Sequence, residues 1–432
     1  MRKLFLSALL MPLFAYSQTP AAKTINTDSV KNVNIIKYYT KAIAANPNDA
    51  TAYYKRGDAK IDLKLYNEAL PDMDKAIVIN PKYDDAYIDR GRIRSFLTDY
   101  KSAIADYTAA LAIKPTGVAF YDRGIAKHSL EDFKGAIADY DEAIKLDPKD
   151  EDYFYNRGRS KANLNDFTGA VQDYSQAITL LPSFPIAYTN RGLAKYNLKD
   201  YKGSIEDYTQ AIVLDPKNEE AYNDRGLSKK SLEDYNGAID DFNHAITLDP
   251  GYLDAFHNRG LAKYHINDYA GAITDYDVVI KGDPKYANAY YNRGLAKDNM
   301  NNFTDAIDDY NQYISLVPKD ADGFYRRGNS KFNLEDYANA ILDYNVAIGI
   351  DASYLYAYIN RGLAKRHQDD YKGAIADYTQ AITIDPKNAD AYNDRGYAEY
   401  MSNNKETACT DFNKAKELGS AEADGNINKY CK

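Results

Sequence analysis

The sequence contains few of the residues that build metal and redox sites. Only five histidines and two cysteines occur among 432 residues. His257 and His265 share one face of an expected helix, but eight residues at 1.5 Å rise separate them by about 12 Å, too far for one ion. No metal-binding cysteine cluster, glycine-rich phosphate loop or nucleophile elbow occurs. The sequence therefore predicts no metal site, no cofactor and no enzymatic activity.

An excess of positive charge is also missing, and so are long apolar runs. Lys and Arg number 54 against 63 Asp and Glu, which gives a net charge of -9. Nucleic-acid binding depends on clustered basic residues that meet phosphates, so a dispersed acidic balance argues against such a partner. A bilayer span needs about 20 apolar residues, and no segment after residue 17 approaches this. We expect no nucleic-acid partner and no integral membrane segment in the mature chain.

The first seventeen residues have the pattern of an export signal. Two basic residues precede the apolar run Leu4–Phe14, and Ala15–Ser17 carries small residues at the two positions that define a cleavage site. A retained membrane anchor is the alternative, but the run is short. We expect cleavage of residues 1–17 and a location in the periplasm or at the outer surface of a Gram-negative cell. Residues 18–31 are polar and aperiodic, and we expect this segment to be flexible.

Both cysteines, Cys409 and Cys431, lie near the C-terminal end. Two cysteines in an exported protein usually pair. A C-terminal segment that folds back on the last expected helix would bring them together. We therefore predict a disulfide between them.

The dipeptide Arg-Gly recurs at a fixed interval. It occurs eleven times at steps of 34 residues, with one step of 33. A period of this length indicates one supersecondary unit copied many times, each copy burying its apolar face against its neighbours. We number the copies 1 to 11 by their glycines, which are Gly57, Gly91, Gly124, Gly158, Gly192, Gly226, Gly260, Gly294, Gly328, Gly362 and Gly396.

Each copy has the pattern of two helices. In copy 6 an apolar stripe from Ala238 to Ile246 follows helical spacing, Asp234 is placed to cap this second helix, and Pro250 ends it. An aromatic residue four positions before every repeated glycine marks the helix before it. Glycine inside a helix costs about 1 kcal/mol relative to alanine. Eleven such glycines therefore indicate that a partner helix approaches closely.

This pattern of aromatic, glycine, alanine and proline positions resembles the tetratricopeptide repeat (TPR) family over most of the chain. The resemblance implies an all-α fold, a right-handed α-solenoid of about eleven helix-turn-helix units with a capping helix at each end. We expect an N-terminal capping helix at residues 32–49, eleven repeats at 50–422 and a C-terminal cap at 423–432. It further implies that the first helices line a concave groove that binds peptides or partner proteins.

Arg precedes every repeated glycine and Asp follows it by fifteen positions. Asp241 lies on the apolar stripe of copy 6 and Arg225 lies one turn from Tyr222, so both should face the helix interface. Because a buried unpaired charge is costly, we predict a structural ladder of Arg–Asp ion pairs that includes Arg225, Asp241, Arg259 and Asp275. Catalysis by paired acids is the alternative, but a motif repeated eleven times marks no unique site.

By the resemblance, the residues three before and one, four and five after each glycine point into the groove. In copies 5 to 8 these positions mix aliphatic, aromatic and amide side chains, which suits an extended peptide or a partner helix. The alternative is that the leucines pack only against neighbouring first helices. The predicted groove residues are Leu193, Tyr196, Asn197, Leu227, Lys230, His257, Leu261, Tyr264, His265, Tyr291, Leu295 and Asn299.

These observations predict an exported, non-enzymatic scaffold that binds protein or peptide partners. A holdase-like or substrate-recruiting subunit of a secretion or envelope-assembly system is one alternative. A glycan-binding module is another, suggested by 42 tyrosines. Most of these tyrosines fall in the repeated core positions, which weakens that alternative.

Overall fold

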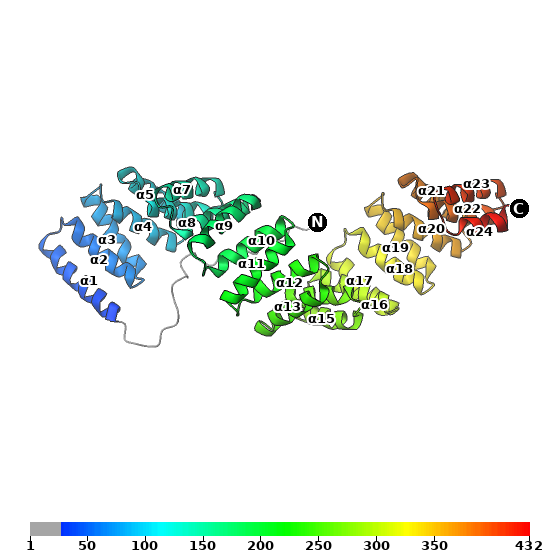
Figure 1. The fold of residues 1–432 in the computed structure, drawn as a ribbon, viewed down its shortest axis with the longest axis horizontal. Helices are drawn as coiled ribbons and strands as arrows, with labels where there is room; N and C mark the ends of the chain where they lie inside the picture. Colours follow the sequence, from blue (N-terminus) through cyan, green and yellow to red (C-terminus); the bar gives the residue numbers. More distant parts are fainter. Residues whose placement is uncertain (1–26) are drawn as a thin grey trace. The chain divides into compact units, whose positions relative to one another are not determined.

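The computed structural model describes residues 27–432, which fold into α-helices joined by short turns (Figure 1). The predicted export signal, residues 1–17, and residues 18–26 lie outside the described residues. The first helix, α1 (Thr27–Ala45), begins within the segment expected to be flexible and five residues before the expected capping helix. Its first turns are polar and carry no apolar periodicity, so the sequence pattern did not mark them.

Each of the eleven copies forms a first helix of 13 residues and a second helix of 13 or 14 residues. The first helices are α2 (Ala50–Asp62), α4 (Asp84–Phe96), α6 (Gly117–Ser129), α8 (Glu151–Asn163), α10 (Pro185–Asn197), α12 (Glu219–Ser231), α14 (Leu253–His265), α16 (Ala287–Asn299), α18 (Ala321–Asn333), α20 (Leu355–His367) and α22 (Ala389–Met401). The second helices are α3 (Tyr66–Ile79), α5 (Tyr100–Ile113), α7 (Phe133–Leu146), α9 (Phe167–Leu180), α11 (Tyr201–Leu214), α13 (Tyr235–Leu248), α15 (Tyr269–Gly282), α17 (Phe303–Leu316), α19 (Tyr337–Ile350), α21 (Tyr371–Ile384) and α23 (Lys405–Glu417).

The chain divides into two compact units. Unit 1 ends at Pro216 and holds α1 and copies 1 to 5; unit 2 covers residues 217–432, with copies 6 to 11 and a last helix, α24 (Ala423–Tyr430). Within each unit a first helix packs on its own second helix, which packs on the first helix of the next copy. The all-α solenoid of helix-turn-helix units that the sequence predicts is therefore confirmed.

The repeated glycines let aromatic rings of the second helix lie against the first. A Cβ atom added to Gly226 would lie 2.7 Å from Cε1 of Phe242, and one added to Gly260 would lie 2.7 Å from Cε1 of Tyr276. Both rings are completely buried. The close helix approach predicted from these glycines is confirmed.

The turn between the two helices holds a left-handed residue in every copy. The φ angles at these eleven positions run from 59° to 64°, and none of the residues is glycine. In copy 6 this residue is Glu233, and the next residue, Asp234, accepts a hydrogen bond from Gly237 N at 3.0 Å. The predicted cap at Asp234 is confirmed, whereas the strained residue before it was not foreseen because no glycine marks it.

We expect Gly226→Ala to destabilise the protein by about 1–2 kcal/mol, because the new methyl group overlaps the buried Phe242 ring and this outweighs the gain in helix propensity. Gly349, in α19, is the matched control, since a Cβ atom there meets nothing within 4 Å. Gly349→Ala should be neutral or stabilise by up to about 1 kcal/mol. Thermal or denaturant unfolding measures both, and equal effects would contradict the proposed role of the glycine.

Candidate functional site

The first helices of unit 2 carry nine of the twelve predicted groove residues, and each helix presents them at the same positions. Tyr264 packs its ring edge-on against Tyr269 with 5.4 Å between ring centroids, and its hydroxyl accepts a hydrogen bond from Asn299 Nδ2 at 2.8 Å. His265 is exposed and stacks on Tyr235, at 4.8 Å between centroids. These contacts join the first helices of copies 7 and 8 along one face.

Two predicted groove residues are instead committed to the packing between copies. His257 is only 8% exposed, and Asn292 Nδ2 donates to its Nε2 at 3.0 Å. Burial, helped by the charge of Lys230, lowers the pKa of His257 to about 4, so the ring is neutral and can accept this bond. The hydroxyl of Tyr291 donates to Asp322 on the next first helix, and burial raises its pKa.

These bonds belong to a series that the sequence did not reveal. An asparagine two positions before the glycine donates from Nδ2 to the residue 35 positions earlier on the preceding first helix. The donors and acceptors are Asn156 to Tyr121 Oη, Asn190 to Tyr155 Oη, Asn258 to Asn223 Oδ1, Asn292 to His257 Nε2 and Asn360 to Tyr325 Oη, at 2.9–3.2 Å. The position three before the glycine therefore stabilises the stack in these copies.

The remaining groove residues stay half-buried or exposed. In unit 1, Leu193 and Tyr196 are half-buried, and Asn197 is exposed and donates to the Leu193 carbonyl oxygen of its own helix at 2.8 Å. In unit 2, Leu227 packs on a core cluster. The half-buried Leu261 and Leu295 and the exposed Asn299 complete the set. Such half-exposed aliphatic and amide groups are available for contact with a partner.

Lys230 differs from its neighbours in charge. It is half-buried on α12, and burial lowers the pKa of its ammonium group to about 8. It is the only cation among the nine groove residues of unit 2 that is ionised at neutral pH by its ordinary chemistry. The other eight are neutral side chains or histidines.

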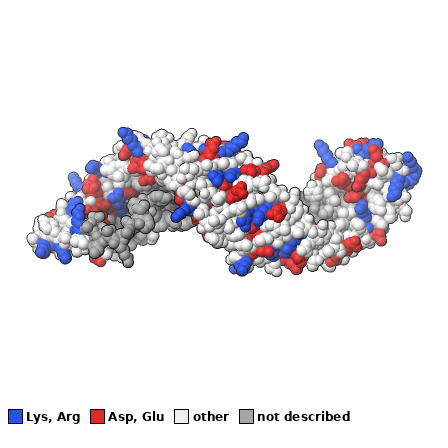
Figure 2. All heavy atoms as spheres, turned by 60° about the horizontal axis from the view of Figure 1, so that its bottom comes forward, with Lys and Arg blue, Asp and Glu red and all other residues white. Residues whose placement is uncertain are grey.

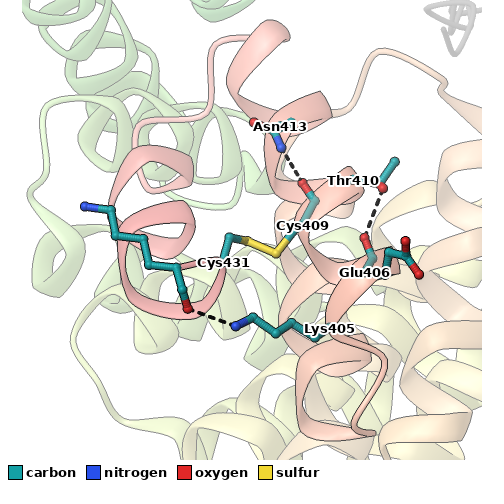
Figure 3. The surroundings of a disulfide bond; sticks show 7 residues. Lys405, Glu406, Cys409, Thr410, Asn413 and Cys431 are labelled. Carbon is teal, nitrogen blue, oxygen red and sulfur yellow. Dashed lines mark hydrogen bonds between the residues drawn. A yellow bond between two sulfur atoms is a disulfide. The ribbon is translucent and has the colours of Figure 1, made fainter.

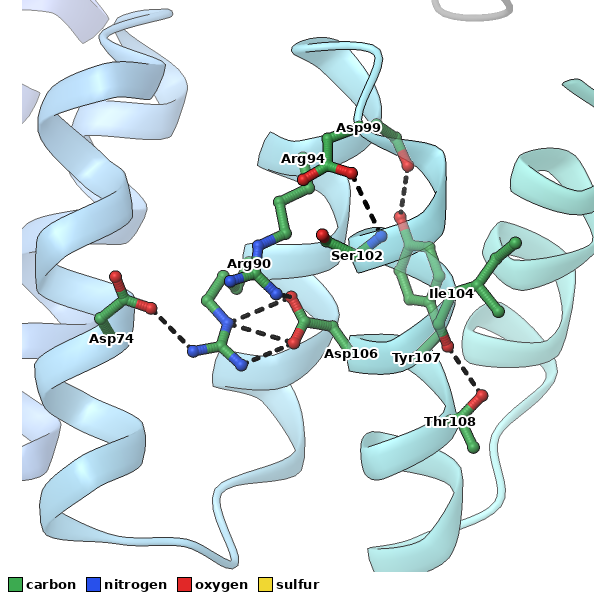
Figure 4. A network of polar contacts seen from close by, with 10 residues as sticks. Asp74, Arg90, Arg94, Asp99, Ser102, Ile104, Asp106, Tyr107 and Thr108 are labelled. Atoms are coloured by element: carbon green, nitrogen blue, oxygen red, sulfur yellow. Dashed lines mark hydrogen bonds and ion pairs between the residues drawn. The ribbon is translucent and has the colours of Figure 1, made fainter. Parts of the chain in front are cut away.

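The repeated arginine contacts the second helix of its own copy and that of the copy before. Figure 4 shows Arg90, whose Nη2 lies 2.6 Å from Asp106 Oδ1 and whose Nη1 lies 2.7 Å from Asp74 Oδ1. The Asp106 carboxylate is 3% exposed and Asp74 is 49% exposed. One guanidinium group thus links three helices of two copies.

The predicted ladder residues occupy the same arrangement in unit 2. Arg225 Nη2 lies 2.6 Å from Asp241 Oδ1, and Arg259 Nη2 lies 2.5 Å from Asp275 Oδ1. The sequence analysis missed a second cation four positions after the arginine, such as Lys263, whose Nζ lies 2.9 Å from Asp275 Oδ2. Each of these buried carboxylates is therefore held by two cations.

Cys409 of α23 is bonded to Cys431 directly after α24 (Figure 3). Their Cα atoms are 5.6 Å apart and 22 positions separate them in sequence. Lys405 Nζ also donates to the Lys432 carbonyl oxygen at 2.9 Å. Tyr430 of α24 stacks on Phe412, at 5.9 Å between centroids. The last helix thus covers the final second helix of unit 2.

Surface charge is mixed on the face seen in Figure 2, where basic and acidic side chains alternate. Among residues 27–432, no helix is long and apolar enough to cross a membrane. The same residues bring together no group of three side chains that could hold a metal ion.

Family models match a large part of the chain. Models described as TPR repeat match residues 124–164, 159–199 and 363–403, and models described as tetratricopeptide repeat match residues 36–84, 84–116, 185–218, 219–252 and 291–354. Together they cover well over half of the sequence. The chain belongs to the tetratricopeptide repeat family. The resemblance read from the sequence is therefore confirmed.

Solved TPR structures are similar to this TPR protein at low sequence identity. The C-terminal part of a TPR repeat-containing protein from Cytophaga hutchinsonii is 20% identical, with a TM-score of 0.49, over 55% of this chain and 98% of that chain. YrrB, described as a TPR protein with an unusual peptide-binding site, is 24% identical, with a TM-score of 0.40, over 43% and 96%. A search of curated proteins found no match. The family assignment rests on the repeat models.

Asp275→Ala should destabilise this TPR protein by about 3 kcal/mol or more, because it strands Arg259 and Lys263 beside a carboxylate that is 1% exposed. Asp277, two positions along the same helix, is the matched control. It also pairs with a repeated arginine, Arg293, but is 56% exposed, so Asp277→Ala should cost about 0–1 kcal/mol. Equal shifts in thermal unfolding would show that the inner pair is no more important than the outer one.

We expect no free thiol in the TPR protein recovered from cells without reducing agent. Cys431→Ser should lower the stability of the C-terminal copy by roughly 3 kcal/mol, because the 22-residue separation is no longer closed in the unfolded chain. Thiol titration and thermal unfolding measure the two effects. Reduced wild type should unfold as the variant does, and two titratable thiols in untreated protein would contradict the prediction.

Proposed function

We propose that this TPR protein is a non-enzymatic scaffold that binds a peptide or protein segment along the first helices of copies 6 to 8. The observation that carries the proposal is the row of half-buried and exposed groups Leu261, His265, Leu295 and Asn299, which the framework does not consume. Aliphatic and aromatic groups with interspersed amides suit an extended chain or an amphipathic helix. The copy-5 residues of unit 1 would extend the same kind of surface.

Export is the second part of the proposal. The pattern of residues 1–17 supports it, and so does the pairing of the only two cysteines, since disulfides persist mainly in oxidising compartments. The periplasm or the outer surface of a Gram-negative cell fits both features. Fractionation of cells, with an N-terminal sequence that starts at Gln18, would support this location.

The surface favours protein ligands over glycans. Eight tyrosines of the second helices, at the position opposite the repeated glycine, have an exposed fraction below 2% or close to it and cannot stack on a sugar. The glycan alternative then depends on the few rings at the turns. A holdase or substrate-recruiting role would use the same surface as the scaffold.

Leu261→Ser combined with Leu295→Ser should weaken partner capture about 30-fold, corresponding to about 2 kcal/mol for lost apolar anchors. These leucines are preferable to Tyr264, which packs on the cluster around Tyr276 and would affect folding when truncated. Binding is measured by pull-down from envelope extract, and circular dichroism and thermal unfolding verify that the fold is kept.

Lys281→Ser is the control for this experiment, because Lys281 is exposed on the second helix α15. It should leave capture unchanged. If the double variant retains its partners at wild-type strength, the binding surface lies elsewhere on the protein.

A further inference from the structure

Lys230 carries a charge that the protein itself does not neutralise. It lies on α12 one turn after Leu227 and is half-buried. Within the described residues no carboxylate oxygen lies within 4.0 Å of its Nζ, and no hydrogen bond is made by this group. The ammonium is not fully enclosed either, since the enclosed polar atoms without partners are Tyr276 Oη, Arg326 Nε and Tyr378 Oη. The cation therefore opens to the surface.

The adjacent lysine shows what the fold does with a lysine that it needs. Lys229 Nζ lies 2.8 Å from Asp241 Oδ2 and 3.3 Å from the Gly237 carbonyl oxygen. Both acceptors come from the second helix of the same copy. Burying an unpaired ammonium is unfavourable, so the framework supplies acceptors where the charge is structural. Lys230 receives none.

The same position in other copies, four residues after the glycine, usually has a partner when it is polar. The pairs are Ser95 with Tyr107 Oη, His128 with Ser160, Tyr264 with Asn299, Asp298 with Tyr310 Oη and Arg366 with Asp394, at 2.7–3.3 Å. Copy 6 differs at the second helix as well. Phe242 stands where Tyr107 and Tyr310 provide a hydroxyl group, so no oxygen faces Lys230 from that ring.

The neighbouring groups are apolar or neutral. Leu227 lies on the same face of α12, and on the next first helix Leu261 and Tyr264 occupy the equivalent positions. His257 is close enough for the charge of Lys230 to lower its pKa, and its ring is neutral. A negatively charged group that arrives here would meet an uncompensated cation in surroundings of low polarity, where an ion pair is strong.

We propose that Lys230 binds a carboxylate group of the segment that occupies the first-helix face of copies 6 to 8. This inference rests on the proposed function and adds the chemistry of the ligand. The carboxylate comes from an Asp or Glu side chain or from the C-terminus of a peptide. Copies 7 and 8 then contact the apolar residues that flank this group.

A synthetic peptide array tests the proposal with the full-length protein. Nonapeptides with blocked ends carry Glu or its neutral isostere Gln at the central position, and a second set has a free C-terminal carboxylate in place of the amide. Wild type should bind carboxylate members about tenfold more tightly than their neutral partners. Preference for central Glu identifies a side chain as the source, and preference for the free end identifies the C-terminus.

Lys230→Met should abolish the preference and Lys230→Arg should retain it. The Met variant should unfold at or above the wild-type temperature, because an apolar side chain of similar size replaces an unpaired charge. Lys229→Met is the control; it should lower the unfolding temperature by leaving Asp241 with one cation and keep the preference.

Two results would overturn the proposal: no preference in wild type, or an undiminished preference in Lys230→Met. Peptides whose binding is lost in the Leu261→Ser, Leu295→Ser variant but is indifferent to the carboxylate would keep the proposed function and reject only this inference. Binding of no peptide at all would reject both.

Discussion

The arrangement of each copy depends on one buried carboxylate and the cations that surround it. Asp275 accepts from Arg259 sixteen positions earlier and Lys263 twelve positions earlier, both on the first helix. An ionised carboxylate taken out of water is tolerated only if its oxygens are satisfied, so the two helices can pack only where both cations reach it. Each Asp thus fixes the relative position of the two helices of its copy. The glycine beside the arginine lets them approach.

The same arginine transmits this position to the preceding copy. Arg293 bonds to Asp309 within its copy and, through Nη1, to Asp277 of copy 7 at 2.5 Å. In other copies an asparagine or hydroxyl group replaces the outer Asp, as Asn243 does for Arg259 at 2.7 Å. The inner partner is always Asp, while the outer partner changes. This difference follows burial: an inner error leaves a desolvated charge, whereas an outer one is solvated by water.

The sequence predicts well the features that recur with a fixed spacing. The Arg and Asp positions could be found because both are repeated eleven times and an Asp on an apolar stripe demands a partner. Lys263 was missed because a lysine in an amphipathic helix ordinarily faces solvent. His257 was assigned to the groove, although a contact with Asn292, 35 positions away, buries it. Such contacts between copies depend on how the first helices are stacked, which a pattern within one copy does not contain.

Repetition also gives a criterion for function that a globular protein does not offer. Every position of a copy has ten counterparts in the same chain, so the ordinary role of that position can be read from its neighbours. Where the counterparts satisfy their polar groups internally, as Asp298 does with Ser330 and Tyr310, the position belongs to the framework in those copies. A counterpart that keeps the polarity and loses the partner costs stability without improving packing. Lys230 is such a residue, and its cost is best explained if something outside the repeat provides the missing charge.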